Sequence, residues 1–79
     1  MKVKHVAPVG AIQAAVEYSG KSKRQVSVDA GYVPTMLARY TSEKTIPNIG
    51  IMAKVAAACG MTLQLTSDDE VIVIDPPTD

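Results

Sequence analysis

The segment from Ser22 to Lys44, SKRQVSVDAGYVPTMLARYTSEK, constrains the fold of this chain more than any other. Ser22, with Gln25 three residues later, has the form of a capping box and predicts the start of a helix. Gly31 predicts where that helix ends, because glycine tolerates the positive φ of a helix C-terminus. Pro34 predicts the first residue of a second helix, where its missing N–H is not needed. We therefore expect two short helices joined by a glycine turn.

The second of these helices has two chemically different faces. Its apolar face follows helical spacing and consists of Val33, Met36, Leu37 and Tyr40. Its other face is short or polar with one long guanidinium, and consists of Thr35, Ala38, Arg39 and Ser42. A face of this kind fits the major groove of DNA, which admits a helix and presents a readable donor–acceptor code. From periodicity alone, a solvated helix face is the alternative.

Two more helices are predicted on either side of this pair. The first spans Val9 to Tyr18, with Ile12, Val16 and the intervening alanines facing inward. The other spans residues 48–59, opens near Pro47 and is closed by Gly60. Its buried side is predicted to consist of Ile49, Met52, Val55, Ala56 and Cys59.

Residues 61–75 predict a β-hairpin. MTLQL alternates between apolar and polar residues, TSDDE supplies a polar turn, and VIVI is apolar on both faces. One face of the second strand is expected to lie on the helices, and the other needs a cover, because an exposed apolar edge strand associates readily. A second subunit is the natural cover, since a chain of 79 residues buries only about 60% of its unfolded surface. The expected dimerisation residues are Leu63, Leu65, Val71, Ile72, Val73 and Ile74.

For this C-terminal segment, a flexible tail or an intramolecular edge strand is the alternative. Met1 to Val6 also alternates as a strand does, although six residues are too few to decide.

The net charge of zero is an average over two unlike segments. Residues 1–60 hold all eight Lys and Arg and three acids, a net charge of +5. Residues 61–79 hold five acids and no base, a net charge of −5. We expect the basic part to meet phosphates while the acidic part points away or meets a basic partner. An uneven division of charge without functional meaning is the alternative.

The sequence shows no residues arranged for catalysis. The acids are scattered or lie in a turn, there is no glycine-rich phosphate loop, and His5 has no second histidine and only the distant Cys59 to share a metal. We therefore expect no enzyme activity, no cofactor and no metal site. A single cysteine, no signal peptide and no long apolar run predict a cytoplasmic protein without membrane contact.

From Ile12 to Gly60 the chain resembles the Cro/CI-type (XRE-like) helix-turn-helix regulators of phages and bacteria. The residues that carry the resemblance are Ile12, Ala15, Ser22, Val26, Ala30, Gly31, Leu37, Tyr40, Ser42, Lys44 and Pro47, followed by the stretch MAKVAAACG. The chain departs from the family pattern at Lys21, Ser27, Val33 and Cys59, which affects how the helices pack.

The resemblance implies one mainly α domain with a lambda-repressor-like bundle of four helices over residues 8–60. The hairpin of residues 61–75 and a tail of residues 76–79 follow. Because Cro proteins begin with a strand, the resemblance also leaves open a strand over residues 1–6 that pairs with the C-terminal strands.

The function implied is a sequence-specific double-stranded DNA-binding transcriptional regulator, a phage-type repressor acting as a homodimer on a pseudo-palindromic operator. By alignment with the family, the DNA-binding residues are Ser22 and Lys23 on phosphate, Pro34, Thr35, Ala38 and Arg39 on bases, and Lys44 on the flanking backbone.

Two alternatives remain at this level. GMTLQL is similar to the tail strand of HipB-type antitoxins, which bind a toxin and repress their own genes. A protein-interaction module that keeps the fold without reading DNA is favoured by the zero net charge and by the absence of a Gln- or Asn-rich face on the second helix.

Overall fold

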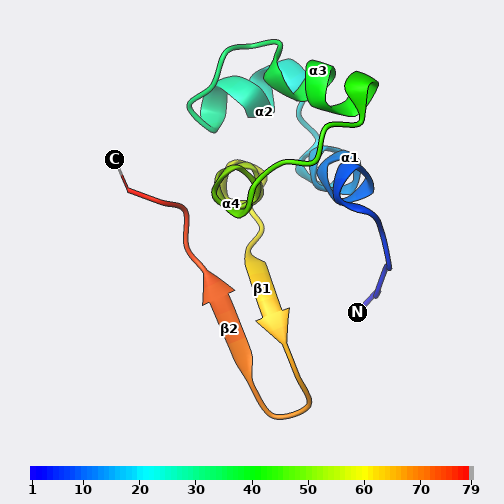
Figure 1. Ribbon diagram of the computed structural model, residues 1–79, viewed down its shortest axis with the longest axis vertical. Coiled ribbons are helices and arrows are strands. Elements are labelled where there is room, and N and C mark those ends of the chain that lie inside the picture. Colours follow the sequence, from blue (N-terminus) through cyan, green and yellow to red (C-terminus); the bar gives the residue numbers. More distant parts are fainter. Residues whose placement is uncertain (79) are drawn as a thin grey trace.

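The computed structural model describes residues 1–78 and consists of four helices followed by a C-terminal two-stranded antiparallel hairpin, as predicted (Figure 1). The elements are α1 (Pro8–Ser19), α2 (Lys23–Asp29), α3 (Met36–Glu43), α4 (Ile49–Ala58), β1 (Leu63–Thr66) and β2 (Val71–Ile74). α2 and α3 lie on one side of α1 and α4, and the hairpin projects from the other side (Figure 1).

The core lies where the four helices meet and is aliphatic, as the composition predicts. Its members are Ile12, Val16, Val26, Met36, Leu37, Val55 and Cys59. Cys59 is the small core residue that the sequence predicts, and burial raises the pKa of its thiol. Ile49 was expected to be buried, but its stripe on α4 extends beyond the end of the core and the side chain is exposed. Ala53 takes a buried position on α4 instead.

α2 begins and ends where the sequence predicts. The Ser22 hydroxyl accepts a hydrogen bond from the Gln25 backbone N–H at 3.0 Å. The Gln25 side chain does not complete the capping box, because its amide donates to Asp29 at 2.7 Å. Gly31 has a φ of +91°, and the Tyr32 N–H donates back to the Ser27 carbonyl, which ends the helix in a tight turn.

The start of α3 differs from the prediction. Pro34 lies in a turn before the helix, because the Met36 N–H donates to the Val33 carbonyl at 3.1 Å and the helix begins at Met36. Val33 is consequently exposed and does not join the apolar stripe. Thr35 occupies the N-cap position, but its side chain makes no capping hydrogen bond.

A serine from α2 supplies the missing cap. Ser27 is fully buried, and its hydroxyl accepts a hydrogen bond from the Leu37 N–H at 3.2 Å. The same hydroxyl donates to the Lys23 carbonyl at 2.7 Å. One side chain therefore satisfies an N–H in the first turn of α3 and fixes that turn to α2.

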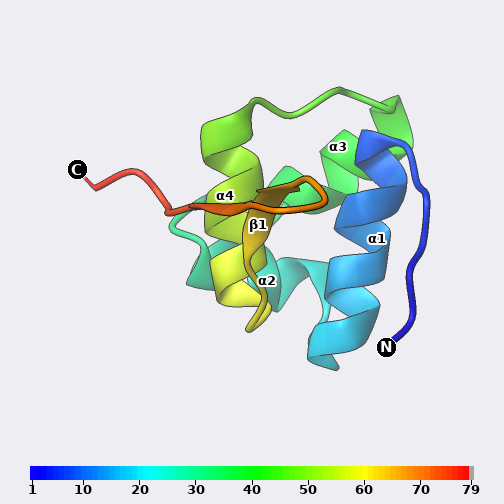
Figure 2. The same cartoon turned by 90° about the horizontal axis from the view of Figure 1, so that it is seen from below.

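The N-terminal strand that the sequence left open does not form in the described residues, whose one sheet contains only β1 and β2. The segment before α1 runs along the outside of that helix (Figure 2). Val6 lies against the start of α1, since a Cβ added to Gly10 would stand 3.2 Å from the Val6 Cβ. The segment before α1 therefore packs on α1, where Val6 makes apolar contact, and not on the hairpin.

The hairpin pairs in one register, with Leu63 opposite Ile74 and Leu65 opposite Ile72. These four residues share one face, whereas Gln64, Thr66, Val71 and Val73 form the other. We expected one face of β2 to lie on the helices, but most of the hairpin lies away from them. Only Leu63 and Ile74, at the root, are half-buried.

The C-terminus of α4 sets the direction in which the hairpin leaves the helical bundle. Gly60 adopts a left-handed conformation and the Met61 N–H donates to the Ala56 carbonyl at 2.8 Å, so the chain turns away from the bundle. The hairpin then has no helix beside it beyond its root.

Replacing Ser27 by alanine tests the cap between the helices. We expect Ser27→Ala to lower the free energy of unfolding by about 1–2 kcal/mol, because the buried Leu37 N–H loses its partner. Urea denaturation followed by circular dichroism measures this. Ser42→Ala is the control, since its exposed hydroxyl bonds only within α3, and it should change stability by less than about 0.5 kcal/mol. Equal effects of the two substitutions would contradict the assignment.

Candidate nucleic-acid interface

The outer face of α3 is free of core contacts. Met36 and Leu37 are buried on the inner side of the helix. The four residues of the predicted outer face are all exposed, namely Thr35, Ala38, Arg39 and Ser42. Short side chains at three of these positions let the helix backbone approach another surface closely. Apart from Val33, which is exposed before the helix begins, this distribution confirms the two-faced helix that the sequence predicts.

Arg39 is the long donor on this face. Among residues 1–78 its guanidinium has no ion-pair partner, although Glu43 lines the same shallow hollow one turn further along α3. A free guanidinium presents five N–H donors in a planar fork, which matches a pair of acceptors in one plane. Guanine O6 and N7 form such a pair.

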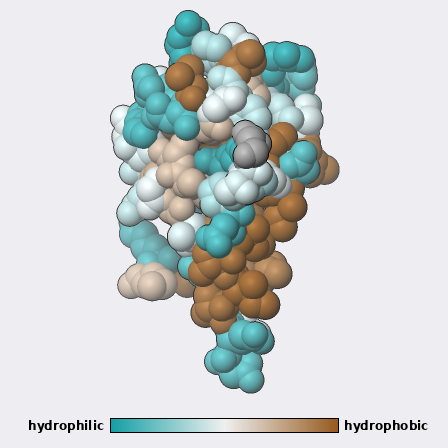
Figure 3. Space-filling view, turned by 90° about the vertical axis from the view of Figure 1, so that its left-hand side faces the viewer, coloured by the Kyte–Doolittle hydropathy of each residue, from teal (hydrophilic) through white to brown (hydrophobic). Residues whose placement is uncertain are grey.

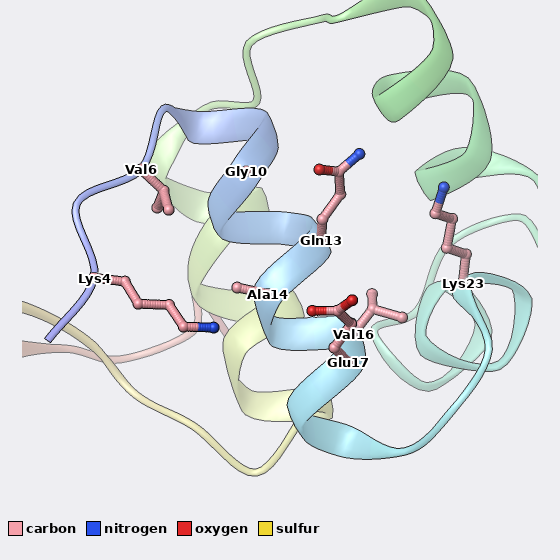
Figure 4. A pocket seen from close by; sticks show the side chains of 8 residues that line it. All are labelled: Lys4, Val6, Gly10, Gln13, Ala14, Val16, Glu17 and Lys23. Atoms are coloured by element: carbon pink, nitrogen blue, oxygen red, sulfur yellow. The ribbon is translucent and has the colours of Figure 1, made fainter. Parts of the chain in front are cut away.

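Lys23 stands closer to the protein than the sequence suggests. Its ammonium donates to the Thr41 hydroxyl of α3 at 3.0 Å, and the side chain is half-buried. Figure 4 shows Lys23 reaching from the start of α2 toward α3, beside a hollow that Lys4, Gln13 and Glu17 also line. Lys23 thus both ties α2 to α3 and places a positive charge at their junction.

The other predicted phosphate contacts lie at the ends of these helices. The Ser22 hydroxyl is occupied as an acceptor in the cap of α2 but keeps its own proton to donate. Lys44 ends α3 in a left-handed conformation with a φ of +54°, and its side chain is exposed. Pro34 is half-buried in the turn before α3. Together, α2 and α3 present the predicted residues around α3, with the Lys23 ammonium and Lys44 both near the C-terminal end of that helix.

Sequence reasoning missed three polar residues in this region. Ser27 caps α3, as described above, and Arg24 is exposed beside Lys23 in the first turn of α2. The Lys21 ammonium bonds the Asp29 carboxylate at 2.8 Å and the Ala58 carbonyl at 3.0 Å. It therefore joins the ends of α2 and α4. Each of these contacts joins different helices, so no pattern within one helix predicts it. The exposed charge of Arg24 fits the basic character that the sequence predicts for residues 1–60.

The ion pair between Lys21 and Asp29 also carries a pH dependence. Hydrogen bonds from the Lys21 ammonium and the Gln25 amide lower the pKa of Asp29 below its ordinary value. The native state therefore gains stability from the ionised carboxylate at neutral pH. That gain is lost as the pH falls through the lowered pKa.

The predicted dimerisation residues are grouped on the hairpin, at the end of the molecule opposite α3 (Figure 1). Leu65, Val71, Ile72 and Val73 are each about half exposed. Figure 3 shows the resulting apolar column, which ends in a hydrophilic tip at the hairpin turn. The outer face of α3 and the apolar hairpin are thus two separate surfaces.

Residues 1–78 contain no group of three or more His, Cys, Asp or Glu side chains placed to hold a metal ion. Nor does this part of the chain contain a helix long and apolar enough to cross a membrane. The chain matches no family model, no curated protein and no solved structure with which it was compared.

Proposed function

We propose that this protein is a sequence-specific double-stranded DNA-binding transcriptional regulator that acts as a homodimeric repressor on a pseudo-palindromic site. The observation that carries the proposal is the outer face of α3, where short exposed side chains surround the unpaired guanidinium of Arg39. A helix of this kind enters the major groove, and the Arg fork reads a guanine there.

The distribution of charge supports the same orientation. Lys23, Arg24 and Lys44 carry positive charge near the ends of α2 and α3, where phosphates flank a helix in the major groove. The carboxylates of Asp68, Asp69 and Glu70 lie in the turn at the far end of the hairpin, away from α3. Zero net charge is therefore compatible with binding a polyanion at one end of the molecule.

The hairpin supports the dimer. Its wholly aliphatic face contains Leu65 and Ile72, which the single chain leaves about half exposed. Burying one such side chain contributes about 1.5–3 kcal/mol when it is fully removed from water. A two-fold dimer would carry two α3 helices about 34 Å apart on one side of the duplex, the spacing of successive major-groove turns.

Selection of bound duplexes from a random DNA library tests the proposal as a whole. We expect enrichment of a pseudo-palindrome whose half-sites are one helical turn apart and contain a guanine contacted by Arg39. Binding without any enriched sequence, or no binding at low salt, would overturn it.

A second candidate is a protein-interaction module, which includes an antitoxin that binds a toxin. The observation that favours it is the same exposed aliphatic hairpin, because such a surface fits a foreign partner as well as a second copy. The two candidates differ in the selection experiment, since a module that does not read DNA enriches no motif. An antitoxin that also represses enriches a motif and, in addition, forms a stable complex with a second protein.

Arg39→Ala tests base readout. We expect the affinity for the selected site to fall by about 1–3 kcal/mol while affinity for unrelated DNA changes much less. The exposed position on α3 predicts unchanged folding. Ser42→Ala, on the same face, is the matched control. Titration of labelled duplexes measures both, and an Arg39→Ala variant with unaltered affinity and base preference would exclude this role.

Lys44→Gln tests backbone contact. Loss of one charge should weaken binding to all duplexes alike and reduce the slope of log K against log salt by about one unit. Lys23→Gln should do the same and also destabilise the fold, because it loses the bond to Thr41. A change in which sequence is preferred would show that Lys44 reads bases instead.

Ile72→Asp tests the dimer surface. The carboxylate would be buried without a partner in the dimer at a cost of several kcal/mol, so we expect monomers and loss of operator binding. The helices should stay folded, since Ile72 is about half exposed in the single chain. Val73→Asp is the control on the opposite hairpin face and should disturb the dimer less. Sedimentation measures the state of association. A dimeric Ile72→Asp variant would refute the role of this face.

A further inference from the structure

An apolar groove lies under α1, between the segment before that helix and the root of the hairpin. Two adjoining hollows form it and share Ala11, Ala15 and Met61. Lys2 and Lys4 line one side of the groove, and neither forms an ion pair within residues 1–78. The chain's own hairpin contributes only its root, so most of the groove is open.

The hairpin has complementary chemistry. Its aliphatic face carries Leu65 and Ile72 toward a turn that ends in Asp68, Asp69 and Glu70, with no basic residue in either strand. The turn is held by the Ser67 N–H, which donates to the Glu70 carbonyl at 2.9 Å. The outer edge of β1 pairs with no other strand of the described chain.

We propose that the groove under α1 is the seat for the hairpin of a second copy, with the acidic turn held beside Lys2 and Lys4. The inference rests on the proposed homodimer and states what each hairpin packs against. The bundle offers alanines at Ala11 and Ala15, whose small side chains let a strand approach α1 closely.

The position of the groove selects the pairing. Figure 1 shows the N-terminal segment on the β1 side of the hairpin, with β2 on the far side. Two copies therefore pair through the outer edges of β1, in antiparallel orientation about a two-fold axis. Each strand of four residues is about 13 Å long, so full overlap carries the turn of one copy to the hairpin root of the other.

Charge fixes the register of this contact. The turn brings its three carboxylates to the side of the groove that Lys2 and Lys4 line. Glu17 is the one acidic residue among the residues that line the groove.

Reciprocal charge reversal tests the seat. One variant carries Lys2→Glu and Lys4→Glu, and the other carries Asp68→Lys and Glu70→Lys. Asp69 is kept because its carboxylate accepts a hydrogen bond from Ser67 in the turn. Each variant alone brings like charges together at both seats of the dimer, so we expect the dimer dissociation constant to rise at least about tenfold.

A mixture of the two variants should form heterodimers, because each hairpin turn then faces a groove whose residues 2 and 4 carry the opposite charge. A single chain with all four changes should regain the wild-type dissociation constant. Analytical ultracentrifugation measures association, and circular dichroism checks that each variant is folded. The wild-type dimer should also weaken as sodium chloride is raised, since exposed charge pairs are screened.

The outcomes separate this inference from the proposed function. A wild-type dimer that neither reversal weakens, or a fourfold variant that regains nothing, overturns the seat and leaves the homodimer intact. A wild type that stays monomeric at high concentration overturns both. If a charge-reversal variant does not fold, two other measurements decide. The fourfold variant must dimerise as the wild type does, and the wild-type dimer must weaken as sodium chloride is raised.

Discussion

The hydroxyl of Ser27 is the point on which the arrangement of α2 and α3 depends. It is fully buried between the helices and serves both of them, as a donor to the Lys23 carbonyl and as an acceptor for the Leu37 N–H. α3 has no capping side chain of its own, since Thr35 makes no such bond. The orientation of the outer face of α3 is therefore set by α2, through one polar contact in an aliphatic core.

Helices α1 and α4 pack against α2 and α3 and hold them in place. Leu37 and Val26 enter the same core as Ile12 and Val55, so α1 and α4 form the base on which α2 and α3 rest. Lys21 then joins the last turn of α4 to the end of α2, and Lys54 of α4 lies 5.4 Å from the Tyr32 ring in the turn between α2 and α3. A core of few residues is thus reinforced by polar contacts at its edges.

Sequence patterns predicted the elements well and their surroundings less well. The helices, the left-handed Gly31 and the hairpin follow from local rules of capping, periodicity and turn chemistry. The start of α3 was misplaced because Pro34 fits a turn before a helix as well as its first residue. The cap from Ser27 and the exposure of the hairpin depend on contacts between distant segments, which periodicity does not encode. Of the candidate site, exposure of the α3 face was predictable, whereas the engagement of Lys23 with Thr41 was not.

In the proposed homodimer, the acidic turn would let the exposed hairpin discriminate among partners. An unpaired strand edge with aliphatic neighbours pairs with almost any other edge, and proteins limit this with charge. Two hairpins aligned in parallel would bring six carboxylates together, which disfavours that arrangement. The proposed antiparallel alignment would separate the turns and place each one beside the lysines near the root of the partner's hairpin. In the proposed dimer, the acidic residues that bring the net charge to zero would also favour this one alignment of the two hairpins.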